Sequence, residues 1–239
     1  MRIEKIFLSL LIIFLFLLQG CGKKSPPLPI EKSIPQGADL TLEPTPNGIN
    51  LWITLPEKTQ GGYTLTKIQY VEIEKKEESI EKGGKLKIKS FKIKPNLHSA
   101  GRLFLYTDTD LKSGYKYTYR LRIKKDFLVA TPFLPERVIY WSDPPSWVRD
   151  LNLILSSPRE LTLKWNPPLF NLKGAPLMGE LFYTIERVKN GKIEYLNIRE
   201  TYFKDKFTEN EKSCYRVRAL LNYYGTFLPG PFSEYLCYP

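Results

Sequence analysis

Apolar and polar residues alternate along short stretches throughout the second half of the chain. This period-two pattern predicts β-strands with one buried face, and turn-forming residues at close intervals are typical of an antiparallel sandwich. Three stretches carry the pattern most clearly: Leu161, Leu163 and Trp165 in ELTLKWN, Tyr183, Ile185 and Arg187 in YTIER, and Tyr215, Val217 and Ala219 in SCYRVRALL. We therefore expect an all-β fold with these residues facing a core.

The first half repeats this pattern more loosely, which indicates an internal duplication. VEIEK at residues 71 to 75 corresponds to YTIER, and LYTDTDLKSGYKYTYRLRI spans residues 105 to 123. In GINLWITLP the apolar alternation leaves Trp52 out of phase with its neighbours. Our main interpretation is a bulge that turns Trp52 into the core. The alternative is a surface aromatic used for binding.

Residues 147 to 239 resemble a fibronectin type III domain. LTLKW matches the second strand with its core tryptophan, YTIER the third, YRVRA the sixth and GPFSEYLCYP the last, in the correct order. The resemblance implies two tandem immunoglobulin-like β-sandwiches, at residues 38 to 143 and 144 to 239. It also makes Tyr117 the tyrosine corner of the first copy, with its hydroxyl bonded to backbone near the turn. The second copy has Ser213 there, so something else must hold that corner.

A charged segment, KKEESIEKGGKLKIKSFKIK, follows the third strand of the first copy but still alternates. A hairpin turning at Gly83 and Gly84 would give this register: Ile73 opposite Ile88, Glu74 opposite Lys87 and Glu72 opposite Lys89. The apolar pair would then face inward and the ion pairs outward, where they would keep an edge strand from aggregating. The alternative is a basic row, Lys85, Lys87 and Lys89, that binds an anionic glycan or lipid headgroups.

The chain opens with two basic residues and a thirteen-residue apolar run, as export signals do. Such a run spans only about 20 Å as a helix, too short to cross a bilayer. Leu18-Gln19-Gly20-Cys21 resembles the lipobox of bacterial lipoproteins, which implies a signal peptide over residues 1 to 20 and a lipid-modified Cys21 that anchors the chain to a membrane. The alternative is a secretory peptide followed by a chance cysteine.

The segment from residue 21 to residue 37 is rich in proline, so we expect an extended linker between membrane and first domain. Gly22 occupies the position where, in enterobacterial lipoproteins, Asp signals retention at the inner membrane. The resemblance therefore favours the outer membrane of a bacterial cell envelope over the inner one.

Composition argues against several kinds of chemistry. The net charge is +11 but is spread along the chain, and no arginine-rich helix or base-reading motif accompanies it, so we expect no nucleic-acid partner. His98 is the single histidine, which leaves zinc sites and histidine-dependent triads without their parts. Asp108 and Asp110 could suggest calcium, but we interpret them as turn-capping residues. We expect no catalytic residue, no metal and no cofactor.

Two cysteines remain, Cys214 and Cys237, with Tyr224-Gly225-Thr226 midway between them. A symmetric hairpin turning at residues 225 to 226 would place them opposite each other, and an exported protein meets an oxidising compartment. We therefore predict a disulfide, the alternative being two buried thiols.

The loops that follow the two sixth strands, residues 126 to 136 and 222 to 231, are the best candidates for contact with a partner. Their aromatic residues form our candidate interaction surface: Phe127, Phe133, Tyr223, Tyr224 and Phe227. The alternative is that these side chains only pack the loops. We predict a non-enzymatic envelope lipoprotein that scaffolds or binds an unidentified envelope protein. The alternatives are binding of anionic glycan or lipid, and service as an accessory subunit of an envelope enzyme or secretion complex.

Overall fold

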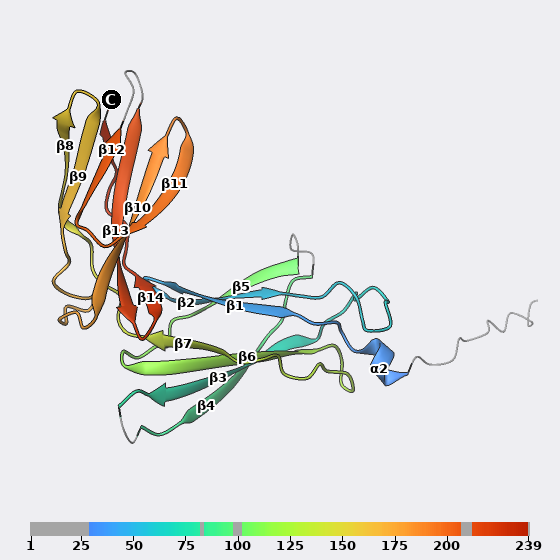
Figure 1. The fold of residues 1–239 in the computed structure, drawn as a ribbon. Helices are drawn as coiled ribbons and strands as arrows, with labels where there is room; N and C mark the ends of the chain where they lie inside the picture. The colour runs from blue at the N-terminus through green and yellow to red at the C-terminus, as the bar shows by residue number, and fades with distance from the viewer. Residues whose placement is uncertain (1–28, 82–83, 98–101, 207–211, 239) are drawn as a thin grey trace, which may run out of the picture.

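The computed structural model describes residues 29–81, 84–97, 102–206 and 212–238. Two β-sandwiches follow one another along the chain, and every strand pair in them is antiparallel (Figure 1). The predicted all-β fold class is confirmed. In the described ranges, no helix combines the length and apolar character that a bilayer crossing requires.

Domain 1 packs a three-stranded sheet against a four-stranded sheet. The first sheet has the order β1 (Asp39–Thr45), β2 (Gly48–Thr54), β5 (Leu103–Asp108). The second has the order β4 (Lys87–Ile93), β3 (Tyr70–Ser79), β6 (Tyr115–Lys124), β7 (Arg137–Trp141).

Domain 2 repeats this arrangement with one additional strand. Its three-stranded sheet has the order β8 (Arg149–Ser157), β9 (Glu160–Asn166), β12 (Tyr202–Lys206). Its other sheet has the order β11 (Lys192–Ile198), β10 (Glu180–Lys189), β13 (Ser213–Tyr223), β14 (Thr226–Pro229), with β15 (Leu236–Tyr238) also paired to β13. The shared strand order supports the duplication that the sequence indicates.

Alternating apolar residues fill both cores as expected. In domain 1, Ile49, Leu51 and Ile53 of β2 are fully buried against the other sheet. In domain 2, Trp165 packs edge-on against Tyr183, with 5.3 Å between ring centroids. The inward residues predicted for domain 2 are buried, apart from Arg187, which is half-buried and ion-paired.

Trp52 does not reach the core, so the predicted bulge is wrong. The ladders joining β2 to β1 and to β5 run without a register shift. Strict alternation therefore places Trp52 on the outer face of the sheet. Its side chain is half-buried there, and its Nε1 donates a hydrogen bond of 2.6 Å to Glu43 Oε2.

The hairpin of β3 and β4 forms, but its register differs from the prediction by three residues. Ile73 lies opposite Phe91, and Ile88 lies opposite Lys76 and is 54% exposed. All three predicted pairs are therefore wrong. A shift by an odd number exchanges the two faces of a strand, which turns Lys89 toward the interior.

Tyr117 is the tyrosine corner that the resemblance implied. The backbone N–H of Lys112 donates to its hydroxyl at 2.7 Å, and burial raises the pKa of Tyr117 to about 12. At the matching position of domain 2, Ser213 is fully buried. The neighbouring residue, Cys214, is disulfide-bonded to Cys237, so a covalent bond holds the strand end beside this corner.

The disulfide confirms the predicted cysteine pairing, since β13 and β15 place Cys214 directly opposite Cys237. The turn differs slightly from the prediction. Tyr224 and Gly225 form it, with φ values of 50° and 82°, which suits the tight turn of a two-residue hairpin. The chain between β14 and β15 then restores the register at the cysteines.

The proline-rich segment is only partly an extended linker. Ile30–Ser33 forms the short helix α2, and backbone hydrogen bonds tie this stretch to a loop of domain 1, including Gly61 N to Lys32 O at 2.9 Å and Gln36 N to Lys58 O at 2.9 Å. The expectation of an extended chain is therefore wrong for residues 30 to 36. They dock on the end of domain 1 farthest from domain 2 (Figure 1).

Candidate functional site

Domain 2 rests on domain 1 through the tip of its β13–β14 hairpin. Leu221 and Leu228 are 1% and 0% exposed and belong to the hydrophobic core of domain 1. Tyr224 stacks on Tyr140 of β7 with 5.4 Å between ring centroids, and Thr226 Oγ1 accepts a hydrogen bond of 3.1 Å from the Tyr140 backbone. Because buried apolar side chains cross the boundary, the two sandwiches share part of one core.

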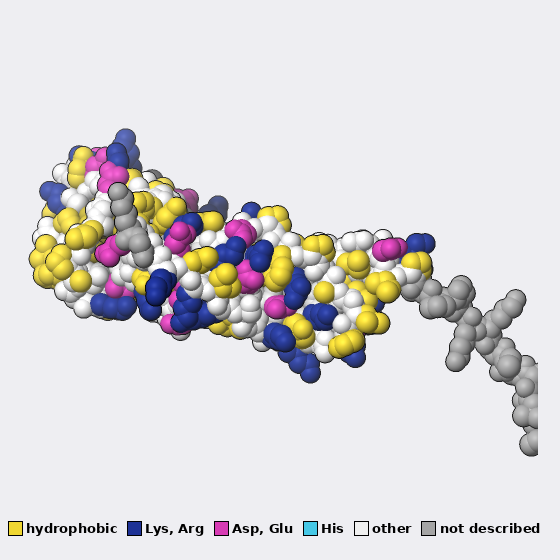
Figure 2. Space-filling view, turned by 90° about the horizontal axis from the view of Figure 1, so that it is seen from below, with side chains coloured by type: hydrophobic (Ala, Val, Ile, Leu, Met, Phe, Trp, Pro, Cys, Tyr) yellow, Lys and Arg dark blue, Asp and Glu magenta, His cyan; other side chains and the backbone are white. Residues whose placement is uncertain are grey.

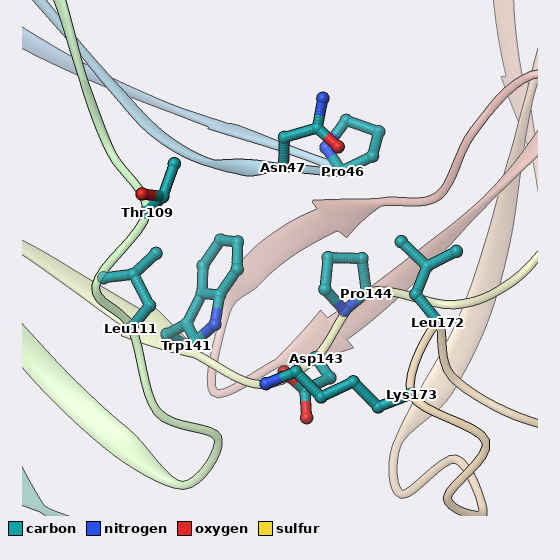
Figure 3. Close-up of a pocket in the computed structure, with 9 residues that line it drawn as sticks. All are labelled: Pro46, Asn47, Thr109, Leu111, Trp141, Asp143, Pro144, Leu172 and Lys173. Atoms are coloured by element: carbon teal, nitrogen blue, oxygen red, sulfur yellow. The ribbon is translucent and has the colours of Figure 1, made fainter.

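A small cavity lies beside the linker between the domains, and residues of both domains line it (Figure 3). Trp141 lines it from the domain 1 side, while Pro144 and Leu172 line it from the other. Lys173 forms an ion pair of 2.8 Å with Asp143 at its edge. The cavity measures about 110 Å³, well below the roughly 300 Å³ at which small-molecule sites begin. We regard it as part of the joint.

A larger groove of about 500 Å³ lies beside this joint, on the outer face of the β11-β10-β13-β14 sheet. Glu43 and Pro44 of domain 1 form one wall. Thr184 and Arg218 line it from the middle strands of the sheet. Phe227 adds an aromatic edge and is 46% exposed. The groove thus combines surfaces of both domains.

Arg218 is the distinctive residue of this groove. Strand pairing sets it opposite Thr184, and its guanidinium stacks on Phe232 at 4.5 Å from the ring centroid. In the described part of the chain its buried Nε has no hydrogen-bond partner, and no ion pair includes Arg218. Loss of water by burial lowers the pKa of Arg218, partly offset by Tyr195 and Glu43.

The neighbouring arginine has a carboxylate partner, although its Nε, like that of Arg218, has no hydrogen-bond partner among the described residues. Arg216 donates to Glu186 Oε2 at 2.6 Å and also stacks on Phe232, at 4.4 Å from the ring centroid. Tyr235 also donates its hydroxyl to Glu186, which is 1% exposed. Burial alone would raise the pKa of Glu186, but hydrogen bonds from Arg216, Tyr235 and Tyr195 outweigh it and lower that pKa. This carboxylate therefore stays ionised, and its charge is compensated by Arg216.

Domain 1 contains the same arrangement with one difference. Arg120 and Arg122 of β6 stack on Phe133 at 4.4 and 4.7 Å, as the two arginines of β13 stack on Phe232. Here both arginines have carboxylate partners: Arg120 bonds Glu74 at 2.8 Å, and Arg122 bonds Glu72 at 2.7 Å.

The two arrangements are equivalent down to the backbone. The residue after each phenylalanine donates its N–H to the carbonyl between the two arginines, Leu134 to Leu121 at 2.8 Å and Ser233 to Val217 at 2.9 Å. On the face of domain 1 seen in Figure 2, Lys and Arg side chains are interspersed with Asp and Glu. Domain 1 therefore pairs both of these outer arginines with its own carboxylates.

The structure separates the aromatic residues of the predicted interaction surface into two groups. Phe127 lies in the loop just after β6 and is 86% exposed, and Phe133 lies over Arg120 and Arg122 on the outer face of β6. Tyr223, Tyr224 and Phe227 lie at the joint between the domains. The five residues do not form one surface, and of them only Phe227 lines the groove.

The predicted basic row is also divided. Lys85 and Lys87 are exposed on the described surface. Lys89 pairs with Glu77 at 2.8 Å and with Asp110, and these hydrogen bonds raise its pKa. Its charge is thus already compensated within the fold.

A buried polar cluster in domain 1 explains the two aspartates considered for calcium. Asp108 Oδ1 accepts the Asp110 backbone N–H at 3.0 Å, which caps the turn as interpreted, while Oδ2 pairs with Lys75 Nζ at 2.7 Å and accepts the Tyr119 hydroxyl at 2.7 Å. Domain 2 has the matching cluster of Arg187, Asp205 and Tyr215. Across the described ranges, no group of three or more His, Cys, Asp or Glu could hold a metal ion.

Two predicted features, the lipidation site at Cys21 and the loop residue His98, lie outside the described residues. The sequence analysis in turn missed Arg216, Arg218 and Phe232. Alternation in YRLRI and YRVRA does place both arginines outward, and aligning VEIEK with YTIER sets Glu72 against Thr184. That comparison of the two copies contains the signal.

No protein-family model matches the chain, and no curated protein matches it. Among solved structures, the chain is similar to the FN1–FN3 domains of chicken CNTN1, with 15% identity and a TM-score of 0.46, over 92% of this chain and 74% of that one.

Proposed function

We propose that this protein is a lipid-anchored lipoprotein of the bacterial cell envelope whose two sandwiches form a non-enzymatic module that binds another envelope protein. The observation that carries the proposal is the groove at the domain joint. It presents an arginine, Arg218, for which the described residues supply no ionic partner, and a half-exposed aromatic ring, Phe227, on two sandwiches that share buried side chains. Aromatic and arginine side chains are enriched where proteins bind one another.

The anchor would be Cys21, with the outer membrane favoured. The chain enters domain 1 at the end near α2, and the groove lies at the other end (Figure 1). The ten-residue strand β3 gives the scale of this separation, roughly 33 Å at 3.3 Å per residue. Domain 1 would then act as a spacer that holds the groove away from the lipid surface.

Two measurements test the anchor. Mass spectrometry of the protein purified from membranes should show a diacylglyceryl and an acyl group on Cys21, with the preceding residues removed. Cys21→Ser should move the protein from the membrane fraction to the soluble fraction after signal cleavage by another route, or leave it as an unprocessed precursor. An unmodified thiol at this position in the native protein would refute the anchor.

Site-specific photo-crosslinking in cells tests the binding function. A photoreactive phenylalanine replaces Tyr195, which is 60% exposed and lines the groove. The matched control replaces Tyr202, which is 50% exposed on the opposite sheet of domain 2. We expect a discrete protein adduct from Tyr195 and none at that mass from Tyr202. Identical adduct patterns, or no adduct from Tyr195, would contradict the proposal.

The basic-row alternative makes a different prediction. Binding of an anionic polysaccharide through Lys85 and Lys87 would fall steeply with salt and would be lost in the Lys85→Glu, Lys87→Glu double variant. Such a result, without a protein adduct at the groove, would replace the proposed function with glycan binding. The identity of any adduct partner distinguishes a scaffold from an accessory subunit of an enzyme or secretion complex.

A further inference from the structure

Comparison of the arginine pairs in the two domains shows that Arg218 lacks the facing carboxylate that Arg122 has. Four outward positions on the middle strands correspond between the domains, and three of them keep their charge: Glu74 and Arg120 match Glu186 and Arg216, and Arg122 matches Arg218. The fourth is Glu72 in domain 1 and Thr184 in domain 2. The carboxylate that neutralises Arg122 at 2.7 Å therefore has no counterpart next to Arg218.

A guanidinium in this environment is prepared to bind an anion. Phe232 holds one face of the Arg218 side chain, and burial has removed water from its Nε. The planar fork of arginine matches a carboxylate through two parallel hydrogen bonds, and a partly dried site strengthens them. Because its orientation is already fixed by stacking, Arg218 loses little conformational freedom on binding.

We infer that the groove binds a single carboxylate, an Asp or Glu side chain of an extended segment of the partner protein, with Arg218 as its ligand. The inference deepens the proposed function and rests on it. Domain 1 shows the chemistry directly, since the equivalent arginine is satisfied there by a glutamate. The occupant takes the place that Glu72 fills in the first copy.

The rest of the groove narrows the kind of segment further. Phe227, Leu220 and Pro229 offer apolar surface beside Arg218. Across from them stands Glu43, whose carboxylate is held by Trp52 and would repel a second acidic residue. The groove therefore favours an isolated acidic residue flanked by apolar ones over a run of acidic residues.

Two phage-displayed hexapeptide libraries test the inference. They are identical except that position four is fixed as Glu in one and Gln in the other, with the remaining positions random. The immobilised full chain in detergent should enrich binders from the Glu library only. For the best binder, fluorescence anisotropy with a labelled synthetic copy should show at least tenfold weaker binding when its Glu becomes Gln, since Gln leaves one neutral acceptor in place of a carboxylate that pairs with the guanidinium through two charge-assisted hydrogen bonds.

Variants of the protein locate the contact. Arg218→Gln should weaken binding about 10- to 100-fold, whereas Arg122→Gln, in the copy already neutralised by Glu72, should leave it unchanged. Thr184→Glu rebuilds the domain 1 pair inside domain 2 and should block the peptide, while Thr184→Gln, of similar size but neutral, should retain binding. Glu43→Gln should strengthen binding because it removes the opposing acid.

The outcomes separate this inference from the proposed function. Equal enrichment from both libraries, or unchanged binding in both Arg218→Gln and Thr184→Glu, would overturn the carboxylate site. If the crosslinked adduct at position 195 also persists in those two variants, the binding function stands without a carboxylate. If the adduct is absent from the parent protein as well, the proposed function itself fails. Circular dichroism melting of each variant identifies any that fail to fold. If Thr184→Glu does not fold, peptide binding by Arg218→Gln alone tests the carboxylate site.

Discussion

Replacing Lys75 with Met tests whether the buried cluster of domain 1 acts as a unit. Lys75 Nζ lies 2.7 Å from Asp108 Oδ2, and the two side chains are 3% and 4% exposed. Lys75 also donates to the Asp110 carbonyl at 2.6 Å and lies 4.6 Å from the centre of the Tyr117 ring. Methionine fills a similar volume, so the change removes the cation without opening a large cavity.

The expected cost follows from what remains. Asp108 would keep its hydrogen bonds from Tyr119 and from the Asp110 backbone but would lose its only ion-pair partner in the described structure. Removing one partner of a buried ion pair typically destabilises by about 3–5 kcal/mol, because the other charge stays buried without compensation. The matched control is Lys76→Met, which breaks a pair with Glu136 whose side chains are 26% and 42% exposed. That exposed pair should contribute little to stability, because water screens it.

Hydrogen exchange resolved by mass spectrometry measures the effect in the intact chain. A loss of about 3–5 kcal/mol corresponds to an increase of roughly 100- to 5,000-fold in the opening equilibrium for amides of β3 and β6, at about tenfold per 1.4 kcal/mol. Peptides from β9 and β10 in domain 2 provide an internal reference. If Lys75→Met changes protection no more than Lys76→Met does, the buried pair does not stabilise the fold as argued.

Three further predictions concern other features. Reducing the bond between Cys214 and Cys237, which closes a loop with a sequence separation of 23, should lower the unfolding free energy of domain 2 by about 3 kcal/mol; an unchanged urea midpoint under reductant would contradict this. The lowered pKa of Glu186 means that it stabilises the native state above its unfolded pKa of about 4.3 and that this contribution is lost as the pH falls further. The urea midpoint of the parent should therefore drop more steeply below pH 4.5 than that of Glu186→Gln, and parallel curves would refute the assignment. Finally, Gly230→Ala would place a Cβ 2.5 Å from the carbonyl oxygen of Pro145 in the linker and should cost about 1–3 kcal/mol of stability. Thermal melts should show this loss, whereas the control Gly37→Ala, whose Cβ would meet nothing within 4 Å, should melt like the parent.

The sequence predicted features that depend on alternation and order. The core faces of β9, β10 and β13 follow from strict period-two patterns, and the pairing of Cys214 with Cys237 follows from strand symmetry about a turn. Neither inference needs a knowledge of side-chain partners.

Features that depend on partners could not be predicted in the same way. The β3–β4 register was wrong because it assumed that charged residues face water, whereas Lys75 and Glu77 are buried. Lys75 pairs with Asp108 across the sandwich, and Glu77 pairs with Lys89 within its own sheet. The position of Trp52 was wrong because a bulge was preferred to strict alternation, which places this residue on the outer face, where its Nε1 donates to Glu43. The groove escaped notice because it joins Glu43 to Arg218, on different domains, and no local pattern links residues so far apart.

The places where the chain enters and leaves domain 1 determine how that domain would bear a mechanical load. Entry is at the start of β1, beside α2, and exit is at the end of β7, beside domain 2, so the two points lie at opposite ends of the sandwich (Figure 1). A pull between the N-terminal segment and domain 2 therefore acts along the strands. Ladder hydrogen bonds lie across the strands, so such a pull strains many of them together in shear instead of peeling them apart singly. Domain 1 should therefore unfold only at a higher force in this direction than when its strands are pulled apart sideways.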